Sequence, residues 1–259
     1  MSMAGTQLIG RTAAILRQVG AGASAGVSTA EVATATGLPR STAQRVLAAL
    51  AADGFVDRDA TRGRWYLGPE MFLLGAVAAE RYDVTATARP VVRALSERTG
   101  ESAFLSARRG DETVCLIAQD GSFPLRSHVL HEGIRFPLGV ASAGLAILAH
   151  LPPAESDAYT RREGPRLEAA HGPAHATGPL LHRIAETRRL GYAVNPGLIV
   201  AGSWGLGAAV FDRDGSPAWA ISLNGVESRL AGERTAQLGI LLLEAAHTLS
   251  RRLGGARHA

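Results

Sequence analysis

The chain lacks lysine and has a single cysteine, and both deficits narrow the classes of protein to which it can belong. All 27 basic residues among the 259 are arginine, and 23 acidic residues reduce the formal net charge to +4. So small an excess does not by itself indicate a nucleic-acid-binding protein. Cys115 stands alone, which excludes an intrachain disulfide framework and a multi-cysteine metal site. Its apolar, alternating surroundings predict a buried and unreactive thiol.

Long apolar runs are missing as well. No stretch approaches the ~18–20 residues of a transmembrane helix, and the first residues lack the basic start and apolar core of a signal peptide. We therefore expect a cytoplasmic protein with no membrane partner. Aromatic residues make up only 5% of the chain, but hydrophobic residues reach 46% and charged residues 19%. This composition is typical of a globular protein with a sizeable core in one or two domains.

The most informative segment is 28–68, which has the layout of a winged helix-turn-helix. Ser28 and Glu31 form a capping box that predicts a helix from about Thr29. That helix should stop near Gly37, and Pro39 fits the first turn of the next one. The second helix has an apolar stripe with helical spacing, at Ala43, Val46, Leu47 and Leu50. Two short strands, 55–58 and 64–68, follow as a hairpin.

Polar and basic side chains lie on the expected outer face of the second helix and on the hairpin. Serine and threonine there can bind phosphates, Gln44 and Arg45 can reach base edges, and the hairpin arginines suit phosphates or a minor groove. The alternative is the solvated polar face of an ordinary helical subdomain. The predicted DNA-binding residues are Arg40, Ser41, Thr42, Gln44, Arg45, Arg58, Arg62 and Arg64.

Three domains or segments are expected: a DNA-binding domain over 1–68, a linker helix over 69–82 and a second domain over 83–259. A first helix is expected at 6–20. The linker is too apolar for a solvated helix, which suggests that a second subunit covers it. A long helix capped by Asp83 should reach about Thr99. The rest reads as mixed α/β, with strands at 102–108, 112–118, 124–130, 191–194, 203–211 and 217–224, and helices at 141–150, 154–162, 177–190 and 230–253.

A second candidate site begins at 139–144, where small residues lead into an apolar helix. Backbone N–H groups at such a helix start can bind an anion, although a Gly-rich turn with a serine cap is an ordinary alternative. The order Gly-x-x-Ser-x-Gly does not match the nucleophile elbow of hydrolases. Two later strands carry small residues on one face, which predicts a cavity between them. These residues are Ser203, Gly205, Gly207 and Ala209, and then Ala220, Ser222 and Asn224. His171 and His175 have metal-ligand spacing, but Gly172-Pro173 interrupts the helix they would need, so we expect neither a metal nor a cofactor.

Segment 29–68 resembles the N-terminal domain of IclR-type bacterial transcription regulators. The resemblance continues through 89–100, 135–138, 191–194 and 220–230, in order and over nearly the whole chain. It implies an α/β (α+β) fold: a winged helix-turn-helix, a linker helix and a GAF-like antiparallel sheet domain flanked by helices. It also implies dimers or tetramers on DNA. Asn195, Gly205, Ser222 and Asn224 align with the family's effector pocket, and 139–143 with its anion site.

This chain departs from the common family pattern at the expected effector site. Gly205 replaces a frequent Cys or Ser, Gly139 a frequent His, and Leu145 a frequent Lys, while 196–199 replaces a more acidic stretch. Each change predicts a roomier or less polar pocket, and hence an aromatic or apolar ring compound with an acid or amide head. The predicted effector-binding residues are Leu138, Gly139, Val140, Ala141, Ser142, Ala143, Asn195, Trp204, Gly205, Leu206, Ser222 and Asn224.

The sequence thus favours a DNA-binding transcription regulator whose operator binding is controlled by a small organic effector. The expected partners are double-stranded DNA with an inverted repeat, the effector, and further copies of the chain as a homodimer or a dimer of dimers. An α/β hydrolase-like enzyme with a helical accessory domain is the alternative. It is weakened by the lack of a coherent nucleophile, base and orienting residue. An architectural DNA-binding module without a ligand is a third possibility, against which the expected cavity argues.

Overall fold

The computed structural model describes residues 3–81, 84–124 and 129–255. Its contacts divide the chain into two compact units, Met1–Asp83 and Val84–Ala259. Each unit has a hydrophobic core of its own. Within the described residues no helix combines the length and apolar character needed to cross a membrane.

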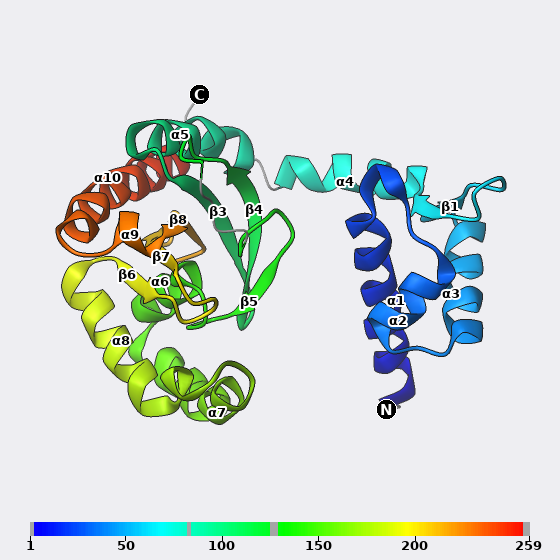
Figure 1. Cartoon of the computed structure of the whole chain (residues 1–259), viewed down its shortest axis with the longest axis horizontal. Helices are drawn as coiled ribbons and strands as arrows, with labels where there is room; N and C mark the ends of the chain where they lie inside the picture. Colours follow the sequence, from blue (N-terminus) through cyan, green and yellow to red (C-terminus); the bar gives the residue numbers. More distant parts are fainter. Residues whose placement is uncertain (1–2, 82–83, 125–128, 256–259) are drawn as a thin grey trace. The chain divides into compact units, whose positions relative to one another are not determined.

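The first unit is a helical bundle completed by a hairpin (Figure 1). Val32 of the second helix, Leu47 of the third and Trp65 of the hairpin meet in one buried cluster. The hairpin strands pair antiparallel from Val56↔Leu67 to Arg58↔Trp65. The elements are α1 (Met3–Ala21), η1 (Ala23–Ala25), α2 (Thr29–Thr36), α3 (Arg40–Ala52), β1 (Val56–Arg58), β2 (Trp65–Leu67) and α4 (Pro69–Arg81).

Helix α4 exposes large apolar side chains instead of burying them. Phe72 is 77% exposed, and Leu73, Leu74 and Val77 are also exposed. A solvated helix normally confines such residues to one buried stripe. This surface therefore has the composition of an interface.

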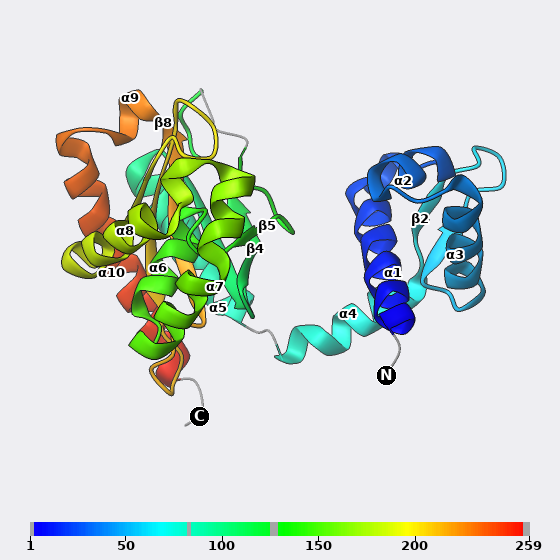
Figure 2. The same cartoon turned by 90° about the horizontal axis from the view of Figure 1, so that it is seen from below.

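The second unit is built on a six-stranded sheet in the order β5-β4-β3-β8-β7-β6, antiparallel throughout. Figures 1 and 2 show helices on both of its faces. Its strands are β3 (Ser102–Arg109), β4 (Glu112–Gln119), β5 (Arg135–Pro137), β6 (Ala193–Pro196), β7 (Ser203–Val210) and β8 (Trp219–Val226). Its helices are α5 (Val84–Thr99), α6 (Ser142–His150), α7 (Pro153–His171), η2 (Pro173–His175), α8 (Thr177–Leu190), α9 (Glu227–Leu230) and α10 (Glu233–Gly255).

Alternation along the strands sends side chains into two separate cores. On one face, Leu206 and Ile221 pack with apolar residues of α5 and α10. On the other face, Ala193 and Ala220 pack with α6, α7 and α8. Every residue of α6 from Ser142 to Ala149 is buried. Helix α6 is therefore a core helix, and only its N-terminal end reaches the site described below.

The mixed α/β architecture and the winged helix-turn-helix are confirmed, but the described residues of the segment 124–130 do not form the expected strand. Pro124, Val129 and Leu130 are not in a strand, and 125–128 lie outside the described residues. The short strand β5 pairs with β4 instead, through Thr113↔Phe136. Cys115 is buried as predicted, and burial raises the pKa of its thiol to about 12.

Two helix boundaries also differ from the predictions. Helix α7 continues to His171 instead of ending near 162, although Pro165 lies within it. Packing overrides the proline here, because Tyr159 and Leu167 are both buried. Pro39 occupies the N-cap position just before α3, not its first turn. The expected cap residue Asp83 lies outside the described residues.

Candidate functional site

The start of α2 is fixed by the capping box that the sequence predicts. The Ser28 hydroxyl accepts from the Glu31 N–H at 3.2 Å, and the Glu31 carboxylate accepts from the Ser28 N–H at 2.6 Å. Gly37 ends the helix in the left-handed conformation at φ 66°. Helix α3 then turns Ala43, Leu47 and Leu50 into the core. Its opposite face is left for contact with a partner.

Most of the predicted DNA-binding residues lie on that outer surface. On α3, Arg40, Ser41 and Arg45 are exposed, and Thr42 is half-buried. On the hairpin, Arg58 and Arg62 are exposed, and the Arg58 guanidinium lies 5.5 Å from the centre of the Trp65 ring. The surface therefore combines one face of a helix with two hairpin arginines, the arrangement that a winged helix places against DNA.

The hairpin turn is held by one carboxylate. Asp59 accepts hydrogen bonds from the Thr61 hydroxyl at 2.6 Å, the Thr61 N–H at 2.8 Å and the Arg62 N–H at 3.0 Å. These bonds lower the pKa of Asp59, the Thr61 hydroxyl having the largest effect. The backbone that carries Arg62 is thereby fixed while its guanidinium stays in solvent.

Two of the predicted residues make contacts inside the protein. The Arg64 guanidinium donates to the Gly26 carbonyl at 2.9 Å and lies 3.3 Å from the Glu31 carboxylate. Gln44 is half-buried, and its side-chain oxygen accepts from the Thr29 hydroxyl at 3.0 Å. Arg64 thus joins the hairpin to α2, and the charge it would offer to DNA is partly offset by Glu31.

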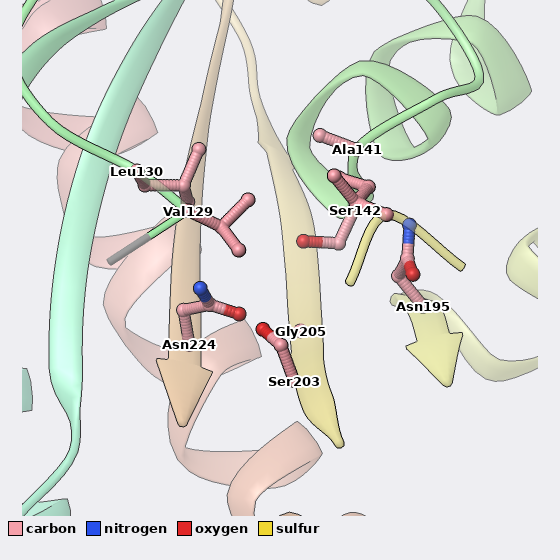
Figure 3. Close-up of a pocket in the computed structure, with 9 residues that line it drawn as sticks. Val129, Leu130, Ala141, Ser142, Asn195, Ser203, Gly205 and Asn224 are labelled. Carbon is pink, nitrogen blue, oxygen red and sulfur yellow. The ribbon is translucent and has the colours of Figure 1, made fainter. Parts of the chain in front are cut away.

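The second unit contains a small pocket at the N-terminal end of α6 (Figure 3). Side chains from α6, β7, β8 and the segment before β5 converge on it. Its volume is about 20 Å³, enough for about one water molecule. Ala141 is the N-cap of α6, and no side chain of the described residues caps this end of the helix. The pocket is lined by Val129, Leu130, Ala141, Ser142, Asn195, Ile199, Ser203, Gly205 and Asn224.

Five predicted residues meet at this pocket: Ala141, Ser142, Asn195, Gly205 and Asn224. A Cβ on Gly205 would lie 3.0 Å from the Ser142 Oγ and 3.3 Å from the Asn224 Oδ1, so glycine leaves room where these two polar groups approach. The predicted effector-binding residues did not include Val129, Leu130, Ile199 and Ser203. Strand parity had placed Ser203 on the cavity face with Gly205, whereas the other three lie in irregular segments that carry no periodic signal.

The remaining predicted pocket residues lie elsewhere. Trp204 and Leu206 point to the opposite sheet face, because neighbouring strand residues alternate, and they pack in the core beneath α5 and α10. Leu138, Val140 and Ala143 are buried in the core around α6. Gly139, at φ 83°, faces Leu180 of α8. Ser222 is fully buried, and its hydroxyl has no hydrogen-bond partner among the described residues.

The predicted cavity at Gly207 is also wrong. A Cβ there would lie 2.5 Å from the Ser142 carbonyl oxygen, so the backbone of α6 occupies the space. The small residues of β7 therefore serve mainly to let a helix approach the sheet, and among the described residues the pocket lies toward Gly205 and Ser203.

The loop that leads into α6 is held in place by hydrogen bonds that its backbone carbonyl groups accept. The Tyr159 hydroxyl donates to the Leu138 carbonyl at 2.7 Å, Arg183 to the Gly139 carbonyl at 3.0 Å and Asn195 to the Val140 carbonyl at 2.6 Å. Burial lowers the pKa of Arg183 to about 10. This value is still well above neutral pH, so the guanidinium stays protonated there. Asn195 also accepts from the Leu198 N–H at 3.0 Å. One pocket residue thus connects the start of α6 to the loop that carries Ile199.

A winged helix-turn-helix joined to a separate α/β unit is the architecture of a ligand-responsive, DNA-binding transcription regulator. Residues 8–60 match the IclR helix-turn-helix domain, and residues 76–251 match the bacterial transcriptional regulator IclR C-terminal domain. The chain belongs to the IclR family.

Relatives along the whole chain agree with this assignment. The chain is 32% identical to the HTH-type transcriptional repressor AllR of Klebsiella pneumoniae, over 96% of this chain and 91% of the relative. It is 29% identical to the transcriptional repressor IclR of Escherichia coli K12, over 89% and 84%. An IclR regulator from Alicyclobacillus acidocaldarius has a similar structure, with a TM-score of 0.76, 26% identity and coverage of 95% and 98%. An IclR homologue from Microbacterium hydrocarbonoxydans in complex with 4-hydroxybenzoate shares the fold, with a TM-score of 0.74, 23% identity and the same coverage.

Proposed function

We propose that the pocket at the start of α6 binds a small aromatic or apolar compound with a carboxylate or amide head, and that this binding controls operator affinity. The observation that carries the proposal is the division of the pocket lining. The apolar side chains of Val129, Leu130 and Ile199 line one pocket with polar groups at the uncapped start of α6; the polar groups are those of Ser142, Asn195, Ser203 and Asn224. In Figure 3 the Ser142 hydroxyl points toward Val129 and Asn224. The helix dipole favours the negative end of such a ligand.

The position of the ring follows from where the structure leaves no space. Helix α6 fills the area at Gly207, so the ring belongs on the side of Val129, Leu130 and Ile199. An aromatic acid is larger than the 20 Å³ pocket, so these cover residues must move outward as it binds. The 4-hydroxybenzoate in the Microbacterium homologue is a compound of this class.

The described lining of the pocket favours binding over catalysis. Among the residues that the structure describes, it holds the hydroxyls of Ser142 and Ser203 but no histidine, aspartate or glutamate. A serine nucleophile without a neighbouring base is not activated. This favours a regulator over the hydrolase-like alternative.

The effector proposal is tested by calorimetry on the full chain with 4-hydroxybenzoate, benzoate and a two-carbon keto acid. We expect the aromatic acids to bind and the keto acid to bind at least tenfold more weakly. Ile199→Ala should weaken binding of the aromatic acid, whereas Val200→Ala, a matched change at an exposed neighbour outside the pocket, should not. Equal binding of all three acids would contradict the proposed chemistry.

The DNA-binding surface that we propose consists of one face of α3 and the exposed arginines of the hairpin. Arg45→Ala should remove ~1–3 kcal/mol of discrimination between operators. Arg62→Ala should weaken binding to all sequences alike. It should also lower the slope of log K against log salt concentration by about one, the value for one lost phosphate contact. Arg17→Ala removes the same charge from an exposed position on α1 and is the control. Operator shift assays in a salt series measure all three variants.

We further propose a homodimer, or a dimer of dimers, on an inverted-repeat operator. The exposed apolar residues of α4 need a partner, and two recognition helices match two half-sites. Phe72→Glu should shift the chain toward monomer in sedimentation and abolish cooperative occupation of the two half-sites. A wild-type chain that sediments as a monomer at micromolar concentration would contradict this assembly.

A further inference from the structure

Three side chains of the first unit form a hydrogen-bonded relay beneath the proposed DNA-binding surface. The Trp65 Nε1–H of the hairpin donates to the Thr29 hydroxyl at 3.0 Å. The Thr29 hydroxyl donates to the Gln44 Oε1 at 3.0 Å. Thr29 is 8% exposed and Trp65 is 2% exposed. The relay therefore runs from hairpin to recognition helix α3 through the first residue of α2, largely out of contact with water.

The direction of this relay is fixed at its buried end. An indole N–H can only donate, so the Thr29 oxygen must accept from Trp65. The single Thr29 proton is then available for an acceptor, and the Gln44 amide oxygen is the one in place. A reversed amide would turn its NH₂ group toward Thr29 and leave the hydroxyl proton without this acceptor, which is unfavourable in a partly buried position. Gln44 is thereby held with its oxygen inward and its NH₂ outward.

The hairpin end of the relay is itself anchored. Trp65 exchanges two backbone hydrogen bonds with Val27, at 2.7 and 3.0 Å. Arg64, its neighbour, is bound to the Gly26 carbonyl and lies beside Glu31. These contacts hold the indole next to Thr29, so the orientation of the Gln44 amide is a property of the folded unit.

We propose that Gln44 is a specificity-determining residue that presents only hydrogen-bond donors to DNA, and that the Trp65–Thr29 relay sets this polarity. A glutamine with both amide groups free pairs with adenine, by accepting from N6 and donating to N7. With its oxygen turned inward, Gln44 suits guanine, whose O6 and N7 are both acceptors. The proposal rests on the DNA-binding surface proposed above, and it reverses the base preference that the residue type alone would indicate.

The test is selection of binding sites from randomised DNA with the full chain. Gln44→Ala identifies the base position that depends on this residue. There, the wild type should prefer guanine over adenine by about tenfold. Thr29→Val removes the relay hydroxyl at nearly constant shape, so the amide can rotate and the preference should fall to about twofold or less. Thr29→Ser keeps the hydroxyl and should restore the wild-type preference.

A second variant tests whether position 44 reads the base directly. In Gln44→Glu one carboxylate oxygen can still accept from Thr29, while the other presents an acceptor to DNA. The preferred base should change to cytosine, whose N4 is a donor, by about tenfold. If Thr29→Val does not fold, the polarity is still tested by the wild type, which must prefer guanine over adenine at this base position. The control is Thr34→Val, at an exposed position of α2, the helix that also carries Thr29. It should leave the base preference unchanged.

The outcomes separate this inference from the proposed DNA-binding surface. If neither Arg45→Ala nor Gln44→Ala alters the selected sequences, the surface itself is misassigned. If both alter them but the wild type prefers adenine, the relay does not set the polarity. The same conclusion follows if folded Thr29→Val keeps the full guanine preference. If Gln44→Glu does not select cytosine, position 44 does not read the base and the inference fails. A reduced guanine preference in Thr29→Val, with rescue by Thr29→Ser, supports the inference.

Discussion

Gly207→Ala inserts one methyl group between β7 and the first turn of α6, and it should destabilise the second unit. The added Cβ would lie 2.5 and 2.6 Å from the carbonyl oxygen and carbon of Ser142, and 2.9 Å from the Ala143 nitrogen. All three are backbone atoms of a buried helix, so no side chain can rotate away. Overpacking of this kind costs about 1–3 kcal/mol. For a unit of this size, 2 kcal/mol corresponds to a fall in Tm of about 4–8 °C.

Thermal unfolding of the full chain, followed by circular dichroism, measures the effect. Gly178→Ala is a matched control, because a Cβ at this position of α8 meets nothing within 4 Å and alanine should stabilise the helix by about 0.5–1 kcal/mol. Gly207→Ala should also weaken binding of 4-hydroxybenzoate, because the start of α6 is displaced. Wild-type Tm in Gly207→Ala would refute the close approach of the helix to the sheet.

Three other perturbations test the packing and electrostatics of the second unit. Glu101→Gln removes a carboxylate that is 2% exposed and bound by Arg229 at 2.7 Å and Arg234 at 3.0 Å. Because both arginines are partly solvated, the free energy of unfolding measured in urea should fall by about 2–3 kcal/mol. Burial, and then Arg183, lower the pKa of His175 below its usual 6.5, so the unfolded chain binds the proton more readily and stability should fall as pH drops below about 6.5. This fall should disappear in a His175→Gln variant, as urea titrations at several pH values would show. Asn195→Ala leaves the Val140 carbonyl without its donor, and should lower stability by about 1–3 kcal/mol and weaken 4-hydroxybenzoate binding in calorimetry.

Local signals in the sequence were sufficient for the first unit. The capping box at Ser28 and Glu31, the glycine at 37 and the apolar stripe of α3 all act within a few residues, and the structure contains each of them. The roles of Gln44 and Arg64 could not be predicted in the same way. Each depends on a partner distant in the chain: Thr29 lies 15 residues from Gln44, and Gly26 lies 38 from Arg64.

The second unit shows the same division between local and long-range causes. Strand parity correctly placed Gly205 and Asn224 on one face, and they meet at the pocket. It could not show that α6 would occupy the space at Gly207, because a small residue permits either a cavity or a close approach. Nor could periodicity find the cover residues Leu130 and Ile199, which lie outside helices and strands.

The burial of α6 separates what must stay constant in this unit from what can vary. The helix at whose start we propose that the effector binds is buried from Ser142 to Ala149, so any exchange of these side chains disturbs the packed core around it. Val129 and Leu130 face the same pocket from an irregular segment outside that core, so a change of their size or polarity leaves the core intact. At the effector site proposed above, substitution of Val129 and Leu130 should therefore change which effector binds, while the start of α6 that would hold its acidic or amide head stays the same.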